Sequence, residues 1–157
     1  MSGSLFSRTV FILGLAIMVS AVSGLGVAAV DAREKDERST KVLLPNAVGV
    51  ALDKRGNLYT ADGKSGYVYC VPPDSQPVLL AKVEGKPTAL TVDRLRNVFV
   101  GTEAGSVFMV SLDGSVSEVF NCCGSPVGLE IDRDGGLIVV METGVVLRVD
   151  REKMENR

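Results

Sequence analysis

The sequence contains no histidine and no tryptophan among its 157 residues, and aromatic residues make up only 5% of it. Without histidine the chain cannot form a Ser-His-Asp triad or use an imidazole as a general base. It also cannot form the usual zinc sites in which histidine supplies ligands. These absences exclude the histidine-dependent hydrolases and the histidine-ligated zinc enzymes.

Cysteine is scarce as well, with only Cys70, Cys122 and Cys123 in the chain, and none of them has the spacing of a zinc site. In an oxidising compartment, the adjacent Cys122 and Cys123 could form a strained vicinal disulfide, or one of them could pair with Cys70. Buried or unpaired thiols are the alternative. The odd count leaves at least one cysteine unpaired or available for a bond between chains.

Charge is nearly balanced, with 17 Lys and Arg against 19 Asp and Glu. The chain has no run of basic residues and no interleaving of basic with aromatic residues. Both features are typical of nucleic-acid-binding surfaces, so we do not expect nucleic acid as a partner.

One long apolar run is present near the N-terminus. Residues Thr9 to Val30 carry no charge and follow Arg8 in a short polar lead. The run is about 22 residues long, enough for a helix to span a bilayer of roughly 30 Å at 1.5 Å per residue. Small residues ending at Ser23 and Ala32 also resemble signal-peptide cleavage sites.

We therefore predict that residues 1–32 are a cleaved signal peptide or a single membrane anchor, with an apolar helix over residues 9–30. A buried core helix is a third alternative. The remainder of the chain is expected to be extracytoplasmic, either secreted or anchored. Residues 33–41, "REKDERSTK", carry charges of both signs and are predicted to form a solvated linker before a domain over residues 42–157.

One phrase occurs three times in that domain: "ALDKRGNLYTAD" from Ala51, "TVDRLRNVFVGT" from Thr91 and "EIDRDGGLIVVM" from Glu130. The copies align on three aspartates that are 40 and 39 residues apart, Asp53, Asp93 and Asp132. A period in this range indicates an array of supersecondary units, and propeller blades are among the candidates.

Each copy alternates apolar and polar residues at period two, the pattern of a β-strand. Asp opens a tight turn between the first two strands, and Gly or Asn closes it. Glycines before the third strand have a similar role (Gly66, Gly105 and Gly144). Small residues recur on the first strand, where propeller blades crowd around the axis (Gly49, Ala89 and Gly128). We predict strands at 48–52, 58–61, 67–71, 78–82, 90–92, 98–101, 107–110, 116–120, 129–131, 137–140 and 145–149.

The third copy lacks a fourth strand. The segment "KVLL", Lys41 to Leu44, mirrors "PVLLAKV" before the second copy and is predicted to be a further outer strand. Pairing it with the last three strands would close a ring and leave no unpaired edge at the seam. The expected fold class is therefore all-β, with about three blades of four antiparallel strands.

The phrase D-x-x-G-N followed by "LYTAD", with "VGVALD" before it, resembles the NHL-repeat and SMP-30/gluconolactonase-like group of six-bladed propellers. The resemblance covers Val42 to Asp150. It implies lactone hydrolases, lyases or sensors of ligands and proteins as the functional classes. It also implies six blades, of which this chain supplies half.

Three interpretations of the half ring follow. Two chains could join head to tail as a homodimer, each donating its Val42 to Leu44 strand to the other's third blade. The chain could be the truncated product of a longer gene, or an open stack of three blades. An open stack with roughly 400 Å² of apolar surface on each end face would forgo about 10 kcal/mol per face, which disfavours an isolated monomer.

The loops between blades and those between second and third strands should share one face. The ligand-binding residues that we predict on this face are Asn46, Asp62, Glu103, Asn121 and Glu142, with Lys86 beside them. Repeated carboxylates could hold a hard cation such as calcium through oxygen ligands, although exposed turn residues chosen for solubility are the alternative. The resemblance implies a metal held by carboxylate and Asn ligands in lactone hydrolases. Only the asparagines match here, so no catalytic residue is assigned.

These observations predict an exported propeller-type binding or scaffold module that uses this loop face for a small-molecule ligand or a protein partner. A metal-dependent lactonase-like hydrolase is the first alternative. A truncated, inactive relative is the second.

Overall fold

The computed structural model describes residues 43–122 and 124–155. The predicted export segment, its apolar helix and the charged linker lie outside the described residues and stay predictions. In the part of the chain that is described, no helix has the length and apolar character needed to cross a membrane.

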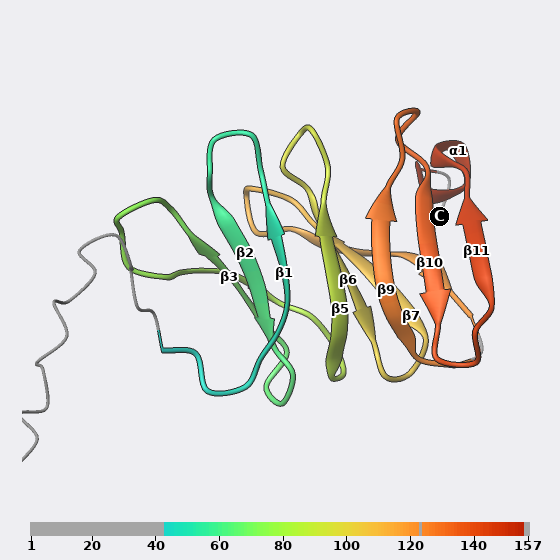
Figure 1. Ribbon diagram of the computed structural model, residues 1–157, viewed down its shortest axis with the longest axis horizontal. Helices are drawn as coiled ribbons and strands as arrows, with labels where there is room; N and C mark the ends of the chain where they lie inside the picture. Colours follow the sequence, from blue (N-terminus) through green and yellow to red (C-terminus); the bar gives the residue numbers. More distant parts are fainter. Residues whose placement is uncertain (1–42, 123, 156–157) are drawn as a thin grey trace, which may run out of the picture. The chain divides into compact units, whose positions relative to one another are not determined.

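The described residues form three antiparallel sheets, which we call blades 1, 2 and 3 in chain order (Figure 1). Blade 1 contains β1 (Ala47–Leu52), β2 (Leu58–Asp62), β3 (Tyr67–Val71) and β4 (Val78–Lys82). Blade 2 contains β5 (Pro87–Val92), β6 (Val98–Thr102), β7 (Ser106–Val110) and β8 (Val116–Asn121). Blade 3 contains β9 (Pro126–Ile131), β10 (Leu137–Met141) and β11 (Val146–Val149). The predicted all-β class, the antiparallel pairing and the eleven strands of the three copies are confirmed.

The predicted outer strand at Lys41 to Leu44 is wrong where it can be compared. Leu43 and Leu44 adopt no strand conformation, and Ala47 instead donates a backbone hydrogen bond to the Leu44 carbonyl in a turn that leads into β1. Lys41 and Val42 lie outside the described residues. Within the described part of the chain, β11 is therefore an edge strand, and no strand pairs with it where blades 1 and 2 have a fourth strand.

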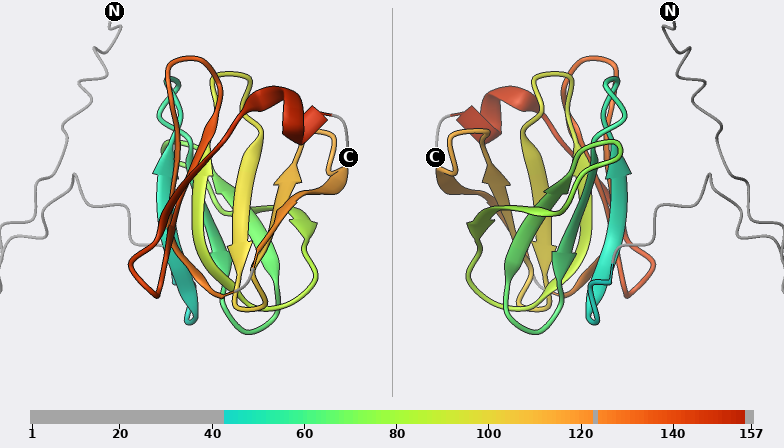
Figure 2. Two further views of the ribbon diagram at one scale, coloured as in Figure 1. Left: turned by 90° about the vertical axis from the view of Figure 1, so that its right-hand side faces the viewer. Right: turned by 90° about the vertical axis from the view of Figure 1, so that its left-hand side faces the viewer.

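A short helix, α1 (Arg151–Glu155), follows β11 and was not predicted. It turns away from blade 3 and contacts β8, the outermost strand of blade 2. Met154 of α1 is only 8% exposed and joins the apolar cluster between blades 2 and 3. The side views show α1 near the edge of the blades where the turns after β1, β5 and β9 lie (Figure 2).

The core consists of two apolar clusters, one at each junction between blades. The first joins blades 1 and 2 through Tyr59, Ala61, Val68, Val83, Leu90, Val98, Val100 and Val110. The second joins blades 2 and 3 through Ala89, Phe99, Val107, Val119, Leu129, Leu137, Val139, Met141, Val149 and Met154. Burying one large side chain of this kind stabilises the fold by about 1.5–3 kcal/mol, so each blade is stabilised by packing on its neighbour.

The first strands of the blades lie side by side, with β1 against β5 and β5 against β9. Gly49 of β1 has a φ of +62°, and a Cβ there would lie 3.3 Å from both Cγ and the backbone N of Leu90 on the next blade. This close approach is the crowding predicted from the small residues. At Gly128, in contrast, the nearest atoms belong to Val140 of the same blade, so the small residue there has a different cause.

Candidate ligand-binding site

The turns that join the first and second strands of the three blades lie at one edge of the fold, which we call the Asp-turn edge. Each turn begins with an aspartate whose Oδ1 accepts two backbone hydrogen bonds from its own turn. Asp53 accepts from Arg55 N and Asn57 N at 2.8 and 2.9 Å. Asp93 accepts from Leu95 N and Asn97 N, both at 2.8 Å.

The third turn repeats this bonding, since Asp132 Oδ1 accepts from Asp134 N at 2.8 Å and Gly136 N at 2.9 Å. Its Oδ2 has a different partner. Gly136 has no side-chain amide, and Arg148 of β11 donates to Oδ2 through Nε at 2.7 Å and Nη2 at 2.6 Å instead. All three carboxylates are therefore engaged in holding their turns.

The same hydrogen bonds set the ionisation of these groups. Partial desolvation opposes charge on Asp53, yet the hydrogen bonds from Asn57 and Arg55 hold its pKa below the ordinary value. Desolvation likewise opposes charge on Asp132, and donation from Gly136 and Arg148 outweighs it and lowers the pKa. Burial, followed by the hydrogen bond to Asp53, raises the pKa of Tyr59. The carboxylates of Asp53 and Asp132 are thus anionic, and the phenol of Tyr59 is neutral, at neutral pH.

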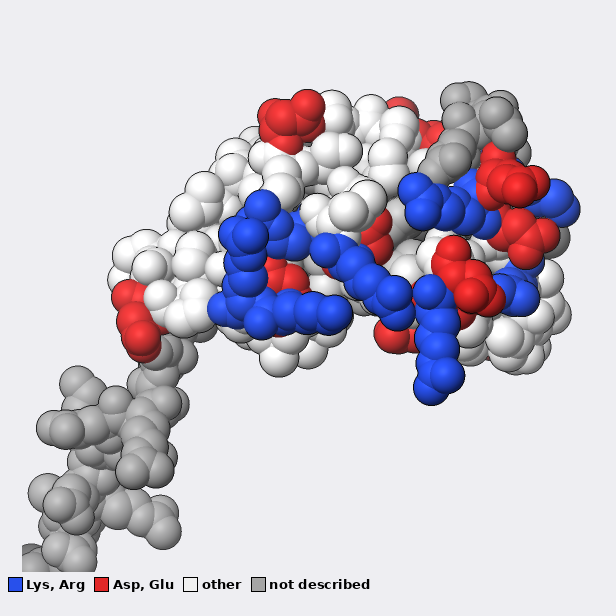
Figure 3. Space-filling view, turned by 90° about the horizontal axis from the view of Figure 1, so that it is seen from above, with Lys and Arg blue, Asp and Glu red and all other residues white. Residues whose placement is uncertain are grey.

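The middle positions of the same turns are rich in cations. The position after the aspartate is basic in every turn (Lys54, Arg94 and Arg133), and Arg55 and Arg96 add two further charges. Seen from above, Lys and Arg side chains form a row across this edge of the molecule (Figure 3). Among the described residues, the side-chain ion pairs join Lys86 to Glu103 and Arg148 to Asp132 and Asp134, so these five cations take part in none of them.

Arg96 has a backbone conformation that is rare for its residue type. Its φ is +71°, in the left-handed region, whereas the equivalent positions of the other two turns are glycines, Gly56 at +82° and Gly135 at +87°. A side chain in this region costs roughly 1–2 kcal/mol relative to the right-handed conformation. Such strain is concentrated at functional positions in proteins, and here it supports a role for the Arg96 side chain.

A hollow of about 840 Å³ lies between the turns. Its lining combines the cations named above with the apolar side chains of Phe99, Met109, Ile131 and Met154, and it also includes five acidic residues, Asp53, Asp93, Glu118, Asp132 and Asp134. Phe99 and Met154 are buried, and Met109 and Ile131 are half-buried, so they form an apolar base beneath an exposed basic rim. The volume is within the range of small-molecule pockets, about 300–1,000 Å³.

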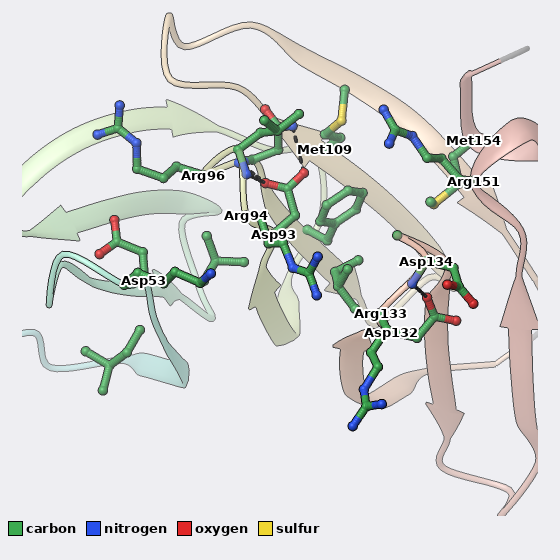
Figure 4. A pocket seen from close by; sticks show the side chains of 18 of the residues that line it. Asp53, Asp93, Arg94, Arg96, Met109, Asp132, Arg133, Asp134, Arg151 and Met154 are labelled. Carbon is green, nitrogen blue, oxygen red and sulfur yellow. Dashed lines mark hydrogen bonds between the residues drawn. The ribbon is translucent and has the colours of Figure 1, made fainter.

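The orientation of the rim is visible in the close view (Figure 4). Arg94 and Arg133 extend to the same side of their turns, and Arg96 extends toward the turn that carries Asp53. Arg151 of α1 lies beside Met154 on the far side of the hollow. Cationic side chains from all three blades and from α1 therefore surround one space.

The five residues predicted from the sequence lie at the opposite edge of the blades, at the strand ends away from the hollow. This edge carries the 2–3 loops and the connections between blades. The ligand-binding residues predicted from the sequence therefore lie at the edge opposite the hollow.

Several of these predicted residues have local structural partners. Asp62 Oδ1 accepts from Lys64 N at 2.8 Å and Ser65 N at 2.9 Å, and these two bonds lower its pKa. Glu103 is paired with Lys86 at 3.1 Å on the surface. Asn121 Nδ2 donates to Ser106 Oγ at 2.8 Å and Glu118 Oε1 at 2.9 Å.

The predicted carboxylates Asp62, Glu103 and Glu142 lie near equivalent places in the three blades, with an offset of one residue in blade 1. A backbone N–H after each second strand donates to a carbonyl before each first strand, at 2.9 Å in all three blades. The donors are Gly63, Glu103 and Glu142, and the acceptors are Asn46, Lys86 and Ser125. Gly63 is therefore the equivalent of the two glutamates, and Asp62 precedes that position.

No three or more Asp, Glu or Cys side chains within residues 43–122 and 124–155 come together as a metal site, so the structure assigns no ligand set to the predicted cation. Cys70 and Cys122 are half-buried and are not bonded to each other, and burial raises the pKa of the Cys70 thiol. Cys123 lies outside the described residues, and the predicted Cys122–Cys123 bond stays a prediction for that reason.

No family model matches the sequence, and no curated protein matches it. Solved structures do match its fold. A streptogramin B lyase superposes over 67% of this chain and 40% of its own length, with a TM-score of 0.53 at 16% identity. Regucalcin from Agrobacterium tumefaciens, a calcium-binding protein, superposes over 66% of this chain and 45% of its own, with a TM-score of 0.55 at 14% identity.

A provisionally assigned gluconolactonase superposes over 67% of this chain and 39% of its own length, with a TM-score of 0.53 at 19% identity. The expected resemblance to the SMP-30/gluconolactonase-like propeller group is confirmed at the level of the fold. Identities this low show the fold alone. The chain spans less than half the length of each of these three structures.

Proposed function

We propose that this chain is a propeller-type binding module whose hollow at the Asp-turn edge binds an organic anion with an apolar part. One observation carries the proposal: cations from all three blades, without carboxylate partners among the described residues, surround an apolar base. A ligand that fits this arrangement has a carboxylate, sulfonate or phosphate group attached to a hydrophobic body.

The electrostatics of the site support this ligand class. Each turn aspartate directs its Oδ1 into its own turn, and Asp132 Oδ2 accepts from Arg148, so none of the three carboxylates forms an ion pair with the five rim cations. Arg guanidinium groups present a planar fork that matches the oxygens of carboxylate and phosphate. An anion entering the hollow would gain these contacts and bury its apolar part against Phe99 and Met154.

The proposal keeps the binding function expected from the sequence and moves it to the other edge of the blades. At the edge first predicted, Glu103 and Lys86 already neutralise each other, and Asp62 is held by its turn. At the Asp-turn edge, in contrast, the five rim cations take part in no side-chain ion pair among the described residues.

The test uses 8-anilinonaphthalene-1-sulfonate, a fluorescent sulfonate with an aromatic body. The double variant Arg94→Gln/Arg133→Gln removes two rim charges that take part in no side-chain ion pair among the described residues. Each partly desolvated charge pair is worth about 1 kcal/mol, so the loss of two should weaken binding roughly thirtyfold in a fluorescence titration. Added salt should weaken binding to the unaltered protein and have less effect on the variant.

The matched control is Lys86→Gln, which removes one exposed cation from the opposite edge and should leave binding unchanged. Dye that adsorbs to exposed apolar surface elsewhere would bind all three proteins equally. Equal affinity of the double variant and the unaltered protein would therefore contradict the proposal.

Lactone hydrolysis is the second candidate function, and its support is the fold shared with the gluconolactonase structure. A metal-dependent reaction of this kind would use the edge predicted from the sequence, where Glu103, Asn121 and Glu142 lie. If the chain has this activity, purified protein should hydrolyse gluconolactone when supplied with calcium, magnesium, manganese or zinc. Asn121→Ala should then lower the rate, whereas Arg94→Gln at the other edge should not. No turnover with any of the four metals would reject this candidate.

A further inference from the structure

The two outward faces of the blade stack expose large apolar side chains. On the outward face of blade 1, Val50 and Leu52 are 64% and 65% exposed. On the outward face of blade 3, Val146 is 63% exposed. Groups of exposed apolar residues on sheet faces mark surfaces that bind another protein surface.

The outward face of blade 1 repeats a face that is already buried elsewhere in the molecule. Val50 and Leu52 lie 40 residues before Leu90 and Val92 of β5. Leu90 is buried in the first interblade cluster, and Val92 packs against that cluster. Blade 1 therefore presents to solvent the apolar pattern with which blade 2 packs on blade 1.

The outward face of blade 3 repeats the other side of a blade junction. In blade 2, Gly101 pairs with Val107 between β6 and β7, and in blade 3 the equivalent pair is Val140 with Val146. Val107 is fully buried in the cluster between blades 2 and 3. Its equivalent Val146 is thus at a position where the repeat places a residue to be covered by a following blade.

We propose that a second copy of this chain covers both faces, with blade 1 of each copy packed on blade 3 of the other. Each contact would repeat the junctions seen between blades 1 and 2 and between blades 2 and 3. Two such contacts related by a two-fold axis give a closed ring of six blades. A second copy is the partner that fits, because the outward face of blade 1 is complementary to the outward face of blade 3.

The lengths of the similar structures agree with this arrangement. The superposed part of this chain covers 45% of regucalcin and 39% of the gluconolactonase structure, so two copies of that part would account for about nine-tenths of the first and about four-fifths of the second. The proposal does not rest on the anion site, which lies at the Asp-turn edge, although Leu52 of the outward face of blade 1 also lines the hollow.

The experiment measures the mass of the full chain by native mass spectrometry, in a mild detergent because of the apolar segment at residues 9–30. We expect twice the mass found under denaturing conditions, where a single chain has 16.6 kDa if it is unprocessed. The variants Val50→Glu and Val146→Glu each place a charge in one half of the contact. Both residues are already exposed in the single chain, so the charge should not unfold it.

Each variant should halve the measured mass while its circular dichroism spectrum stays that of the unaltered protein. The matched control is Leu112→Glu in the turn between β7 and β8, a residue that is 42% exposed and lies on neither outward face. This variant should keep the double mass. A single-chain mass for the unaltered protein would overturn the proposal. So would a double mass that both variants retain, as pairing through the apolar segment alone would give, or a mass that grows beyond two copies with concentration.

Discussion

At the residue scale, the aspartate turns show how far local sequence determines structure. The sequence predicted that Asp53, Asp93 and Asp132 open tight turns by bonding their own backbone, and all three do so. This prediction works because an Asx turn is made of neighbours in the chain. What local reasoning could not supply was the Arg148 donor to Asp132, which comes from a strand sixteen residues away.

Substitution of Arg96 would measure the free-energy cost of placing an arginine at this position of the rim. Arg96→Gly replaces a strained residue with the one found at the equivalent position of the other two turns. The relief of backbone strain exceeds the entropy that glycine adds to the unfolded chain, so we expect the free energy of unfolding to rise by about 0.5–1 kcal/mol. Binding of the sulfonate dye should weaken in the same variant.

Urea denaturation measures the first effect and fluorescence titration the second. The control is Arg94→Gly in the same turn, since Arg94 does not have a positive φ. Glycine at position 94 should also weaken binding of the dye, but it should lower the free energy of unfolding. If Arg96→Gly were destabilising, the backbone at Arg96 would not be strained.

At the element scale, the strands were predictable and the chain after β11 was not. Alternation at period two located each strand of the three copies because a two-faced sheet needs it. The helix α1 has only five residues, too few to establish a helical period, and its reason for folding is tertiary. Met154 fills space beside β8, and no pattern in "REKME" indicates that contact.

This dependence makes α1 sensitive to one substitution. Met154→Ala removes a buried side chain from the cluster between blades 2 and 3. We expect a loss of about 2–3 kcal/mol in the free energy of unfolding, the low end for a core methionine because the helix is at the edge of the fold. Lys153→Ala, an exposed neighbour on the same helix, should change stability by less than about 0.5 kcal/mol. Equal effects of the two variants in urea denaturation would mean that α1 does not pack as described.

At the scale of the whole molecule, the period of the repeat predicted the blades but not the site. The rim cations lie in turns that are about 40 residues apart, so no window of the sequence contains a basic run. Folding places the three turns at one edge and turns scattered charges into a row (Figure 3). The signal was present in the aligned copies as Lys54, Arg94 and Arg133, one residue after each aspartate.

The expected closing strand failed for a related reason. Its assignment rested on likeness between "KVLL" and "PVLLAKV", yet a strand forms only where a neighbouring strand offers hydrogen bonds. In β4 that neighbour is β3 of the same blade. Residues 43 and 44 have no such neighbouring strand in the single chain, so the two similar sequences adopt different structures.

The design of the turns also has an evolutionary consequence. The first and last residues of each turn hold the backbone, whereas the two residues that follow each aspartate are exposed, and only Asp134 among them has a side-chain partner, Arg148. Substitutions at these positions can therefore change the ligand preference of the rim in one blade at a time, while the sheets stay folded. A library randomised at those six codons should yield folded proteins with altered ligand preference, and it offers a direct route to new binders on this scaffold.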